Sequence, residues 1–370
     1  MHFNIVSIAA GLVLLASSVA GFTLSRGRNK LMILRMNSGK DNLRTHSLTH
    51  SLNHSLNHSL THSLTHSLTL SLTHLLTVDS DMSKYSLADQ VQRFAKAKND
   101  NNQRVLNIDS VYNPTYLKGK TVLVTGGNRG IGLALAHELK SQGSFHRYFL
   151  DSFLTHLNLG ANVIITSRTP APALDSLFQV ITGIDVQNND SGKQLATALN
   201  NKKIDILINN AGYFYEPVEK MDSLNFDEEM KMIDICAIGP LRISSGLYNA
   251  KLLSPGSKII MITSQGGSTS WRFTQNPTGH DYGHHMSKSA ANMMSVLLAQ
   301  ELKAAGIAVG ILHPGFNKTD MTKKYSHIWE IEGAVDASVG AKRVIHEIGL
   351  LDMSRSGKFY NCEDGLEIPY

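Results

Sequence analysis

The segment from Thr121 to Lys140 constrains the fold of this chain more than any other. Its first four residues, Thr121–Val124, are apolar or β-branched and predict a strand buried on both faces. Gly126, Gly130 and Gly132 follow in the spacing TGxxxGxG, and the apolar residues after them recur with a helical period. Glycines allow a pyrophosphate to approach the backbone, and a helix N-terminus offers it free N–H groups. The segment therefore predicts a dinucleotide site, with a plain strand-to-helix loop as the alternative.

The sequence pI of about 9.0 arises mainly from an N-terminal leader. Residues 1–81 hold six Lys or Arg and three Asp, which gives +3 of the formal net charge of +5. The 29 basic and 27 acidic residues of 82–370 nearly balance, so this part lacks the basic stripe of a nucleic-acid-binding protein. Cys236 and Cys362 provide neither a disulfide framework nor metal-ligand spacing. We expect no nucleic-acid partner and no metal.

Residues 1–22 predict a signal peptide or an uncleaved membrane anchor. An apolar run ends in small residues around Ala20 and Gly21, which is typical of a cleavage site, and the run is also just long enough to span a membrane. Phe22 and the basic, acid-poor stretch after it resemble the bipartite plastid leaders of algae with secondary plastids. These features predict a secretory or plastid route, whereas translation from Met82 would make the protein cytoplasmic.

The rest of the leader, within residues 23–81, contains a four-residue repeat close to THSL between Thr45 and Thr77. Its histidines recur every four residues and would form a metal-binding stripe on a helix. Low-complexity sequence without packing variety more often has no stable structure, and we expect that here. After Met82 a helix is predicted, with Leu87, Val91 and Phe94 on its apolar face and Ser86 as its cap.

Seventeen residues at 144–160 interrupt the catalytic domain, which is expected to span 82–370. Deleting them joins Gly143 to Ala161 and gives SQGANVIITSR, an ordinary helix end, turn and strand. The segment is therefore interpreted as an insert or as a retained intron. It would enter at the sheet edge remote from the strand C-termini, so cofactor binding could survive it.

Further buried strands alternate with helical patterns along the chain. The predicted strands are Val163–Ile165, Val180–Val186, Ile204–Ile208, Ile259–Ile262 and Ile307–Leu312. Helical patterns cover Asp227–Leu247 and Ser287–Leu302. Such alternation implies right-handed crossovers and an α/β fold with a doubly wound parallel sheet.

The residues after the second strand indicate the cofactor. An acid there would favour a free ribose 2′-hydroxyl, but the chain has Ser167 followed by Arg168. Arg129 in the glycine turn adds a second cation. Two guanidiniums and a hydroxyl suit a 2′-phosphate, so NADP(H) is expected, with two solvated surface arginines as the alternative.

The ordered motifs of this chain resemble those of the short-chain dehydrogenase/reductases. They are TGGNRGIG, Asp185-Val186, NNAG at 209–212, the strand end at Ser264, Ser287-Lys288 and PGFNKT at 314–319. The resemblance covers about 117–370, and the end, GKFYNCEDGLEIPY, is similar to sniffer-type and C-factor-type carbonyl reductases. The cofactor residues it implies are Gly126, Asn128, Arg129, Ile131, Arg168, Asp185, Val186, Asn210, Lys288 and Thr319.

Two catalytic positions depart from the family pattern. The resemblance implies that Ser264 holds the substrate oxygen and Lys288 binds the ribose, but His284 stands four residues before Lys288, where the family has its proton-donating Tyr. Tyr282 lies about 240° away from Lys288 on a helix and should face elsewhere. Cys236 takes the place of the Asn that connects the family's proton relay. His280 and His285 are expected to be polar loop residues.

Two functions are compatible with this site. The first is NADPH-dependent reduction of an aldehyde, ketone or quinone with an altered proton donor. The alternative is a non-catalytic NADP(H)-binding sensor or scaffold that has lost the Tyr, and fold alone does not decide between them. The loop at 318–332 should cover the substrate, and its side chains suggest an apolar or aromatic one: Met321, Tyr325, Ile328 and Trp329. The resemblance also implies a homo-oligomer.

Overall fold

The computed structural model describes residues 23–25, 33–35, 84–141 and 160–370. The chain divides into two compact units, Met1–Asp79 and Ser80–Tyr370. In the first unit, β1 (Thr23–Ser25) pairs antiparallel with β2 (Ile33–Arg35). The predicted signal peptide or anchor and the THSL repeat lie outside the described residues, and so does the predicted insert apart from Gly160.

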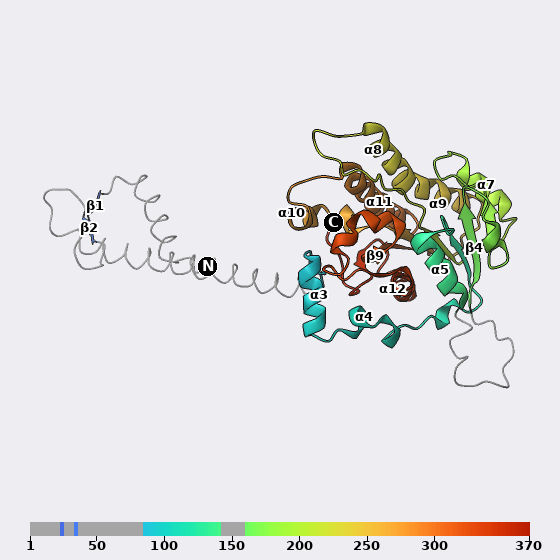
Figure 1. Ribbon diagram of the computed structural model, residues 1–370, viewed down its shortest axis with the longest axis horizontal. Coiled ribbons are helices and arrows are strands. Elements are labelled where there is room, and N and C mark those ends of the chain that lie inside the picture. Colours follow the sequence, from blue (N-terminus) through green and yellow to red (C-terminus); the bar gives the residue numbers. More distant parts are fainter. Residues whose placement is uncertain (1–22, 26–32, 36–83, 142–159) are drawn as a thin grey trace, which may run out of the picture. The chain divides into compact units, whose positions relative to one another are not determined.

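The second unit is built on a seven-stranded parallel sheet with the order β11-β8-β7-β6-β3-β4-β5 (Figure 1). Its strands are β3 (Thr121–Val124), β4 (Asn162–Ser167), β5 (Gln179–Thr182), β6 (Ile206–Asn209), β7 (Lys258–Ile262), β8 (Ala308–His313) and β11 (Phe359–Asn361). Every neighbouring pair is parallel, which confirms the predicted doubly wound α/β sheet. The strand order reverses between β3 and β6, so the ligand crevice is expected at their carboxyl ends.

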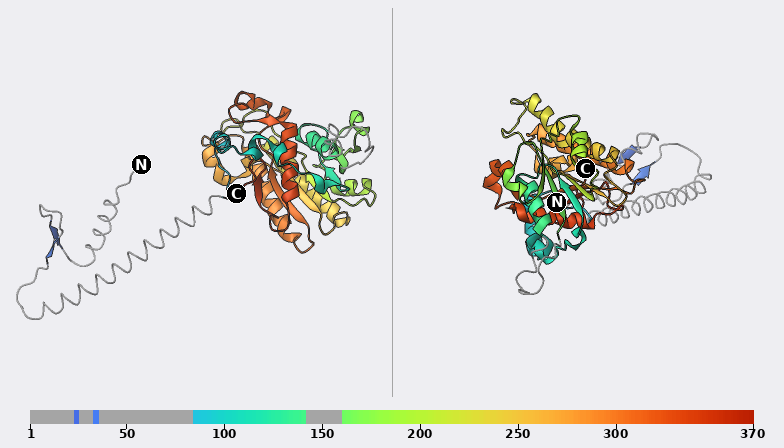
Figure 2. Two further views of the ribbon diagram at one scale, coloured as in Figure 1. Left: turned by 90° about the horizontal axis from the view of Figure 1, so that it is seen from below. Right: turned by 90° about the vertical axis from the view of Figure 1, so that its right-hand side faces the viewer.

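Helices cover both faces of this sheet (Figure 2). The main ones are α5 (Gly130–Ser141), α7 (Ser191–Ala198), α8 (Phe226–Ile233), α9 (Gly239–Asn249), α11 (Tyr282–Glu301) and α12 (Ala337–Leu350). Helix α5 packs against α12, whereas α7 packs against α9 and α8 against α11. Two buried apolar clusters result, one under each helical layer, and together they fix the sheet that carries the site.

Short elements complete the unit. The remaining helices are α3 (Gln90–Asn99), α4 (Gln103–Leu106), α6 (Pro172–Asp175) and α10 (Thr269–Gln275). The 3-10 turns are η1 (Ile108–Ser110), η2 (Thr115–Leu117), η4 (Gln265–Gly267) and η5 (Asp320–Ile328), and η3 (Asp234–Ile238) is a π-helical turn joining α8 to α9. A small parallel pair is formed by β9 (Asn317–Lys318) and β10 (Val335–Asp336).

The predicted apolar face of the first helix is wrong for two of its three residues. Leu87, which precedes α3, and Val91 are 41% and 45% exposed, whereas Phe94 is half-buried. The buried side chains of α3 are Gln90, Arg93 and Ala97. The predicted cap is also wrong, because Asp89 accepts the capping bond from Gln92 N and the Ser86 hydroxyl donates to Asp364. Polar partners far along the chain therefore decide how this helix lies.

Two shifted boundaries and one strand that was not predicted bear on the site. Strand β5 ends at Thr182, so Asp185 and Val186 follow it in a turn. Helix α11 begins at Tyr282, which brings His284 into its first turn. The sequence analysis did not predict β11, because only three residues of this edge strand pair with β8.

The described residues on either side of 142–159 lie together at the amino edge of the sheet. Helix α5 ends at Ser141, and the chain returns at Gly160 against the last turn of that helix. Ala161 N donates to Leu139 O at 3.0 Å, and β4 begins one residue later. The described framework therefore brackets this segment at the edge opposite the strand carboxyl ends.

Candidate active site

The glycine turn between β3 and α5 is shaped by close contacts as well as by backbone conformation. Gly126 and Gly130 have φ angles of +64° and +55°, which glycine adopts without strain. A Cβ atom on Gly132 would lie 2.3 Å from both Asn210 Nδ2 and Gly126 O. Asn210 Nδ2 in turn donates to Thr125 O and Gly126 O at 3.0 and 3.1 Å. The NNAG motif thus fastens the turn to the end of β6.

This turn fits a dinucleotide pyrophosphate. It opens directly into the first turn of α5, whose free N–H groups and positive dipole end favour an anion. Asn128 and Ile131 are half-buried there, whereas Arg129 is exposed. The residues that would hold the cofactor therefore stand at the reversal of strand order, where doubly wound sheets bind their ligands.

Where the adenosine end of the cofactor is expected, the side chains agree only partly with the predicted contacts to a 2′-phosphate. Arg168 and Arg129 are exposed, and neither guanidinium has a hydrogen-bond or ion-pair partner in the described part of the chain. Ser167, however, is buried and donates its hydroxyl to Thr169 O at 2.7 Å, so this hydroxyl is already engaged. Asp185 accepts a bond from Gln187 N, and Val186 packs against Gly239 at the start of α9.

The three candidate catalytic residues come from β7 and α11. Ser264 follows β7 and caps η4, where its Oγ accepts a bond from Gly266 N at 3.0 Å. Helix α11, which carries His284 and Lys288, packs along η4. A Cβ atom on Gly266 would lie 3.1 Å from His284 Nε2, so only a glycine leaves room for the imidazole there. The fold thus places His284 against Gly266, which is two residues after Ser264 in the chain.

The surroundings of His284 keep its ring neutral. Phe214 stacks beside it, with ring centroids 4.3 Å apart, and the buried Nδ1 has no hydrogen-bond partner among the described residues. Burial, and then the positive charge of Lys288, hold the pKa of His284 well below its usual 6.5. Lys288 itself makes no hydrogen bond or ion pair within residues 84–141 and 160–370. Its ammonium is thus available to a ligand.

The neighbouring histidines have structural partners. His285 Nδ1 lies 3.1 Å from Gly266 O, and its Nε2 lies 3.0 Å from Asn276 Nδ2. Burial lowers the pKa of His285 to about 4. His280 pairs with Asp281 at 2.9 Å. His280 lies in the loop before α11, as expected, but His285 lies within α11, so the expectation of a loop residue is wrong for His285.

Tyr282 and Cys236 also have defined surroundings. The Tyr282 hydroxyl lies beside Gly279, in the loop that precedes α11, rather than beside η4. Cys236 is buried in the π-helical turn η3, and its Sγ lies 3.4 Å from Tyr213 O. Such π-helical turns are rare and occur often at functional sites.

Next to His284 lies an aromatic wall of Phe214 and Tyr325, of which the sequence predicted Tyr325 but neither Phe214 nor the adjoining Lys324. Lys324 Nζ lies 3.7 Å from the centroid of the Phe214 ring, and Tyr325 stacks with Phe214 at 6.3 Å. The Tyr325 hydroxyl donates to Asp281 at 2.8 Å, so η5 is tied to the start of α11. Thr319 begins η5 in a reciprocal cap with Thr322. Phe214 lies two residues after the NNAG motif, and this closeness to a motif at the strand end was the available signal for it.

Comparisons with known proteins identify the family. The family model for short chain dehydrogenase matches residues 120–328, which is more than half of the chain. The chain belongs to the short-chain dehydrogenase family. Short-chain dehydrogenases are NAD(P)-dependent oxidoreductases, and the glycine turn and the catalytic positions described above lie within the matched range.

This short-chain dehydrogenase has both enzyme relatives and structural neighbours. It is 29% identical to 1-hydroxy-2-glutathionyl-2-methyl-3-butene dehydrogenase from Rhodococcus sp. (strain AD45), over 66% of this chain and 96% of that protein. The NADPH-bound carbonyl reductase from chicken fatty liver is 25% identical with a TM-score of 0.56, over 69% of this chain and all of that one. Carbonyl reductase Sniffer of D. melanogaster shares the fold at 23% identity, with a TM-score of 0.54 over 68% of this chain and all of its own.

No helix among the described residues is both long and apolar enough to cross a membrane. No group of three or more His, Cys, Asp or Glu side chains among them could hold a metal ion.

Proposed function

We propose that this short-chain dehydrogenase reduces the carbonyl group of a small apolar or aromatic substrate with NADPH, and that His284 is the proton donor. The observation that carries the proposal is the approach of His284 to the turn that begins at Ser264, on the helix that also carries Lys288. A hydroxyl, an imidazole and an ammonium at one strand end are the groups that carbonyl reduction needs.

Each residue has a distinct role in this proposal. NADPH supplies the hydride when it is bound. Ser264 donates its hydroxyl to the carbonyl oxygen and stabilises the negative charge that develops there. His284 delivers the proton to that oxygen. Lys288 holds the ribose and keeps the imidazolium acidic through charge repulsion.

The preference for NADPH rests on the two exposed arginines. Arg129 and Arg168 stand at the glycine turn and just past β4, and both guanidiniums are free to grip a 2′-phosphate. The carbonyl reductase from chicken fatty liver, a structural neighbour, was solved with NADPH bound. Two charge-assisted contacts would favour NADPH over NADH by about 1.5–3 kcal/mol each.

An apolar or aromatic substrate is supported by the wall beside His284. The ring of Phe214 packs against the imidazole in a tilted arrangement, and Tyr325 stacks with Phe214. Met321, at the start of η5, is 48% exposed, so an apolar side chain is available to a partner molecule there. Such a wall would hold an aromatic aldehyde, ketone or quinone by ring stacking.

A homo-oligomer is supported by apolar side chains exposed on the α8, α9 and α11 layer. They are Phe226, Met230, Ile238, Leu241, Tyr248, Met286, Met293 and Leu297. Exposed apolar groups gathered on one helical layer favour association with another chain.

The test combines coenzyme titration with a carbonyl panel. NADPH should quench intrinsic fluorescence at lower concentration than NADH, and Arg168→Asp should reverse that order. Turnover of at least one aromatic aldehyde, ketone or quinone should follow at mildly acid pH. Equal affinity for the two coenzymes would refute the arginine grip, and tight NADPH binding without turnover of any carbonyl would refute the reductase function.

A further inference from the structure

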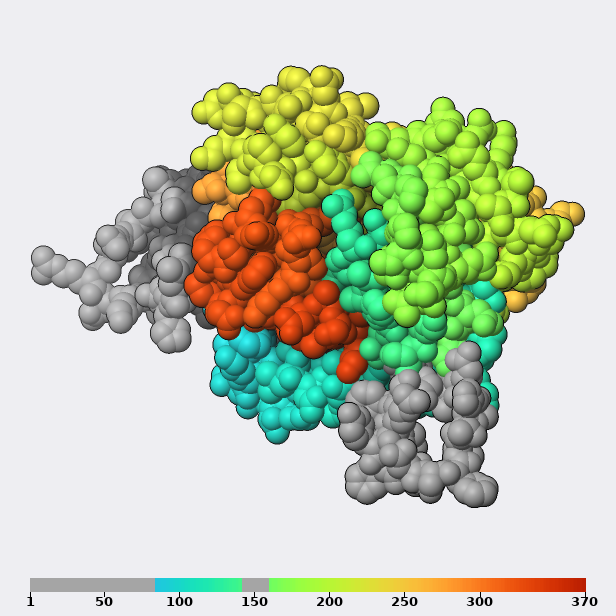
Figure 3. Space-filling view, turned by 45° about the vertical axis from the view of Figure 1, so that its right-hand side comes forward, coloured from blue at the N-terminus to red at the C-terminus, as the bar shows by residue number. Residues whose placement is uncertain are grey.

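Helix α3 packs against the catalytic unit through a polar face. Gln90, Arg93 and Ala97 are 8%, 4% and 4% exposed, whereas Leu87 and Val91 face solvent. In Figure 3 the cyan surface of this N-terminal segment adjoins the red surface of the C-terminal part of the chain. Buried polar side chains are costly unless each one finds a partner, so the partners of this face are informative.

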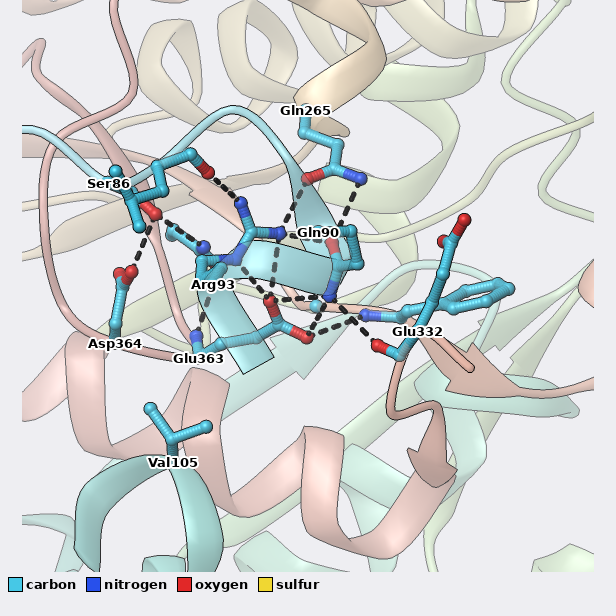
Figure 4. A network of polar contacts seen from close by, with 12 residues as sticks. Ser86, Gln90, Arg93, Val105, Gln265, Glu332, Glu363 and Asp364 are labelled. Carbon is cyan, nitrogen blue, oxygen red and sulfur yellow. Dashed lines mark hydrogen bonds and ion pairs between the residues drawn. The ribbon is translucent and has the colours of Figure 1, made fainter. Parts of the chain in front are cut away.

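Arg93 joins α3 to two distant segments (Figure 4). Its Nη2 lies 3.1 Å from Glu363 Oε2, in an ion pair whose two side chains are 5% and 6% exposed. The same nitrogen donates to Gln265 Oε1 at 2.9 Å. The guanidinium also lies 5.4 Å from the centroid of the Trp271 ring in α10. A planar, always charged group can make all these contacts at once.

Gln90 makes a second set of contacts one helical turn earlier. Its Nε2 lies 3.2 and 3.3 Å from the Glu363 carboxylate oxygens and 3.3 Å from Glu332 O. Its Oε1 accepts a bond from Gln265 Nε2 at 3.3 Å. Glu363 Oε1 in turn accepts from Phe316 N at 3.3 Å. The amide and the carboxylate thus share one connected network.

The segments that meet at this network border the active site. Gln265 follows Ser264 directly in η4, and Phe316 stands three residues before Thr319 in the loop after β8. Glu332 ends the loop that covers the substrate side, and the next residue, Gly333, packs against the Phe94 ring of α3. Two segments at the carboxyl edge of the sheet, η4 after β7 and the chain from 314 to 333 after β8, are therefore joined through one helix.

We infer that α3 is a positioning element of the active site and that Gln90 and Arg93 are its positioning residues. They hold η4, the 314–319 loop and the 318–332 loop in register, so that Ser264 and the substrate cover keep their places. Helix α3 and Glu363 both lie outside the range matched by the family model, 120–328. The inference therefore assigns to these outer segments a role in the reaction, and its catalytic part rests on the proposed function.

The test compares two glutamine-to-leucine changes on the same helix in the full chain. Gln90→Leu removes the network contacts, and Gln92→Leu makes the same chemical change on the exposed face. Amide hydrogen exchange of 264–268 and 316–333 is measured first, because it reports loop order without turnover. Arg93→Lys, which keeps the charge and loses the guanidinium fork, provides a graded variant. The kcat and the KM for NADPH are then measured.

Gln90→Leu should speed exchange in both loops by about tenfold, the equilibrium value of one ordinary buried hydrogen bond. The same variant should lower kcat by a similar factor and leave the KM for NADPH unchanged. Both of its effects, on exchange and on kcat, should be larger than those of Gln92→Leu. Arg93→Lys should fall between them. Folded Gln90→Leu protein with the exchange rates and kcat of Gln92→Leu would overturn the inference.

A second variant covers loss of folding. If Gln90→Leu does not fold, Gln265→Leu cuts the link between α3 and η4 from the η4 side, and unchanged exchange at 264–268 in that variant overturns the inference. If the unaltered protein binds NADPH but reduces no carbonyl, the proposed function fails, and the exchange comparison still decides whether α3 orders these loops.

Discussion

Replacing His284 tests the proton donor most directly. His284→Phe keeps a ring that can stack on Phe214 but removes both nitrogens, and His284→Tyr differs from it by one hydroxyl. If the imidazole is the acid, the Phe variant should lose about 10²–10⁴-fold in kcat, the usual value of general acid catalysis. His284→Ala should lose at least as much. His284→Tyr should keep or raise the activity at pH 8, because the phenol remains protonated there.

The pH dependence follows from the surroundings of the ring. An imidazole with the ordinary pKa of 6.5 is about one quarter protonated at pH 7. Burial and the charge of Lys288 hold the pKa of His284 well below 6.5, so the protonated fraction is smaller still. Since only imidazolium is a strong acid, kcat should fall about tenfold for each pH unit above that lowered pKa. His284→Tyr should flatten this slope between pH 6 and about pH 8.

The assay is NADPH oxidation at 340 nm under saturating substrate, from pH 5 to 9, with coenzyme affinity measured separately at each pH. Tyr282→Phe is the matched control, since Tyr282 lies beside Gly279 on the preceding loop. An unaltered rate in both His284→Phe and His284→Ala would refute the role of the imidazole. If Tyr282→Phe is then the slow variant, Tyr282 is the proton donor and the assignment of His284 is wrong.

Two other predictions concern the framework of the site. Gly132→Ala should weaken NADPH binding and lower stability by about 1–3 kcal/mol, because its Cβ would meet Gly126 O at 2.3 Å and open the turn; coenzyme titration and thermal unfolding measure both effects. Burial lowers the pKa of His313 to about 3, so the folded state resists the proton that the unfolded chain takes up below pH 6.5. Between pH 7 and pH 5 this group should therefore lower the free energy of unfolding by about 2 kcal/mol. Urea unfolding should show this loss in the unaltered protein and not in His313→Gln.

The central strands and the glycine turn could be predicted because their causes are local. Strand β3 has the predicted bounds, Thr121–Val124, since four apolar residues before a glycine turn have few alternatives. The resemblance to the short-chain dehydrogenase motifs implied Ser264, His284 and Lys288 as one site, and the four-residue spacing put the last two on one helix, α11. In each case the signal lies within one element or one ordered motif.

Contacts between distant segments could not be predicted in this way. The sequence around α3 suggested an apolar face that includes Leu87 and Val91. Arg93 is buried instead, because it pairs with Glu363, which lies 270 positions later in the chain. Phe214 and Lys324 meet across two loops whose paths no local pattern fixes. In a sequence, a buried ion pair is seen only as two charged residues. Most charged residues lie at the surface, so the pair is not recognised as buried.

The two departures from the family pattern belong together physically. A tyrosine donor has one polar atom, so its proton must return through groups beside its own hydroxyl, which is the task that the resemblance gives to an Asn on the helix preceding the donor's helix. Here Cys236 occupies that position and is turned toward Tyr213 O at 3.4 Å. An imidazole has two nitrogens and can release a proton from one and regain it at the other. In the proposed mechanism a proton returning to the second nitrogen would have to reach His284 Nδ1 without the relay Asn, and this nitrogen is buried with no hydrogen-bond partner among the described residues.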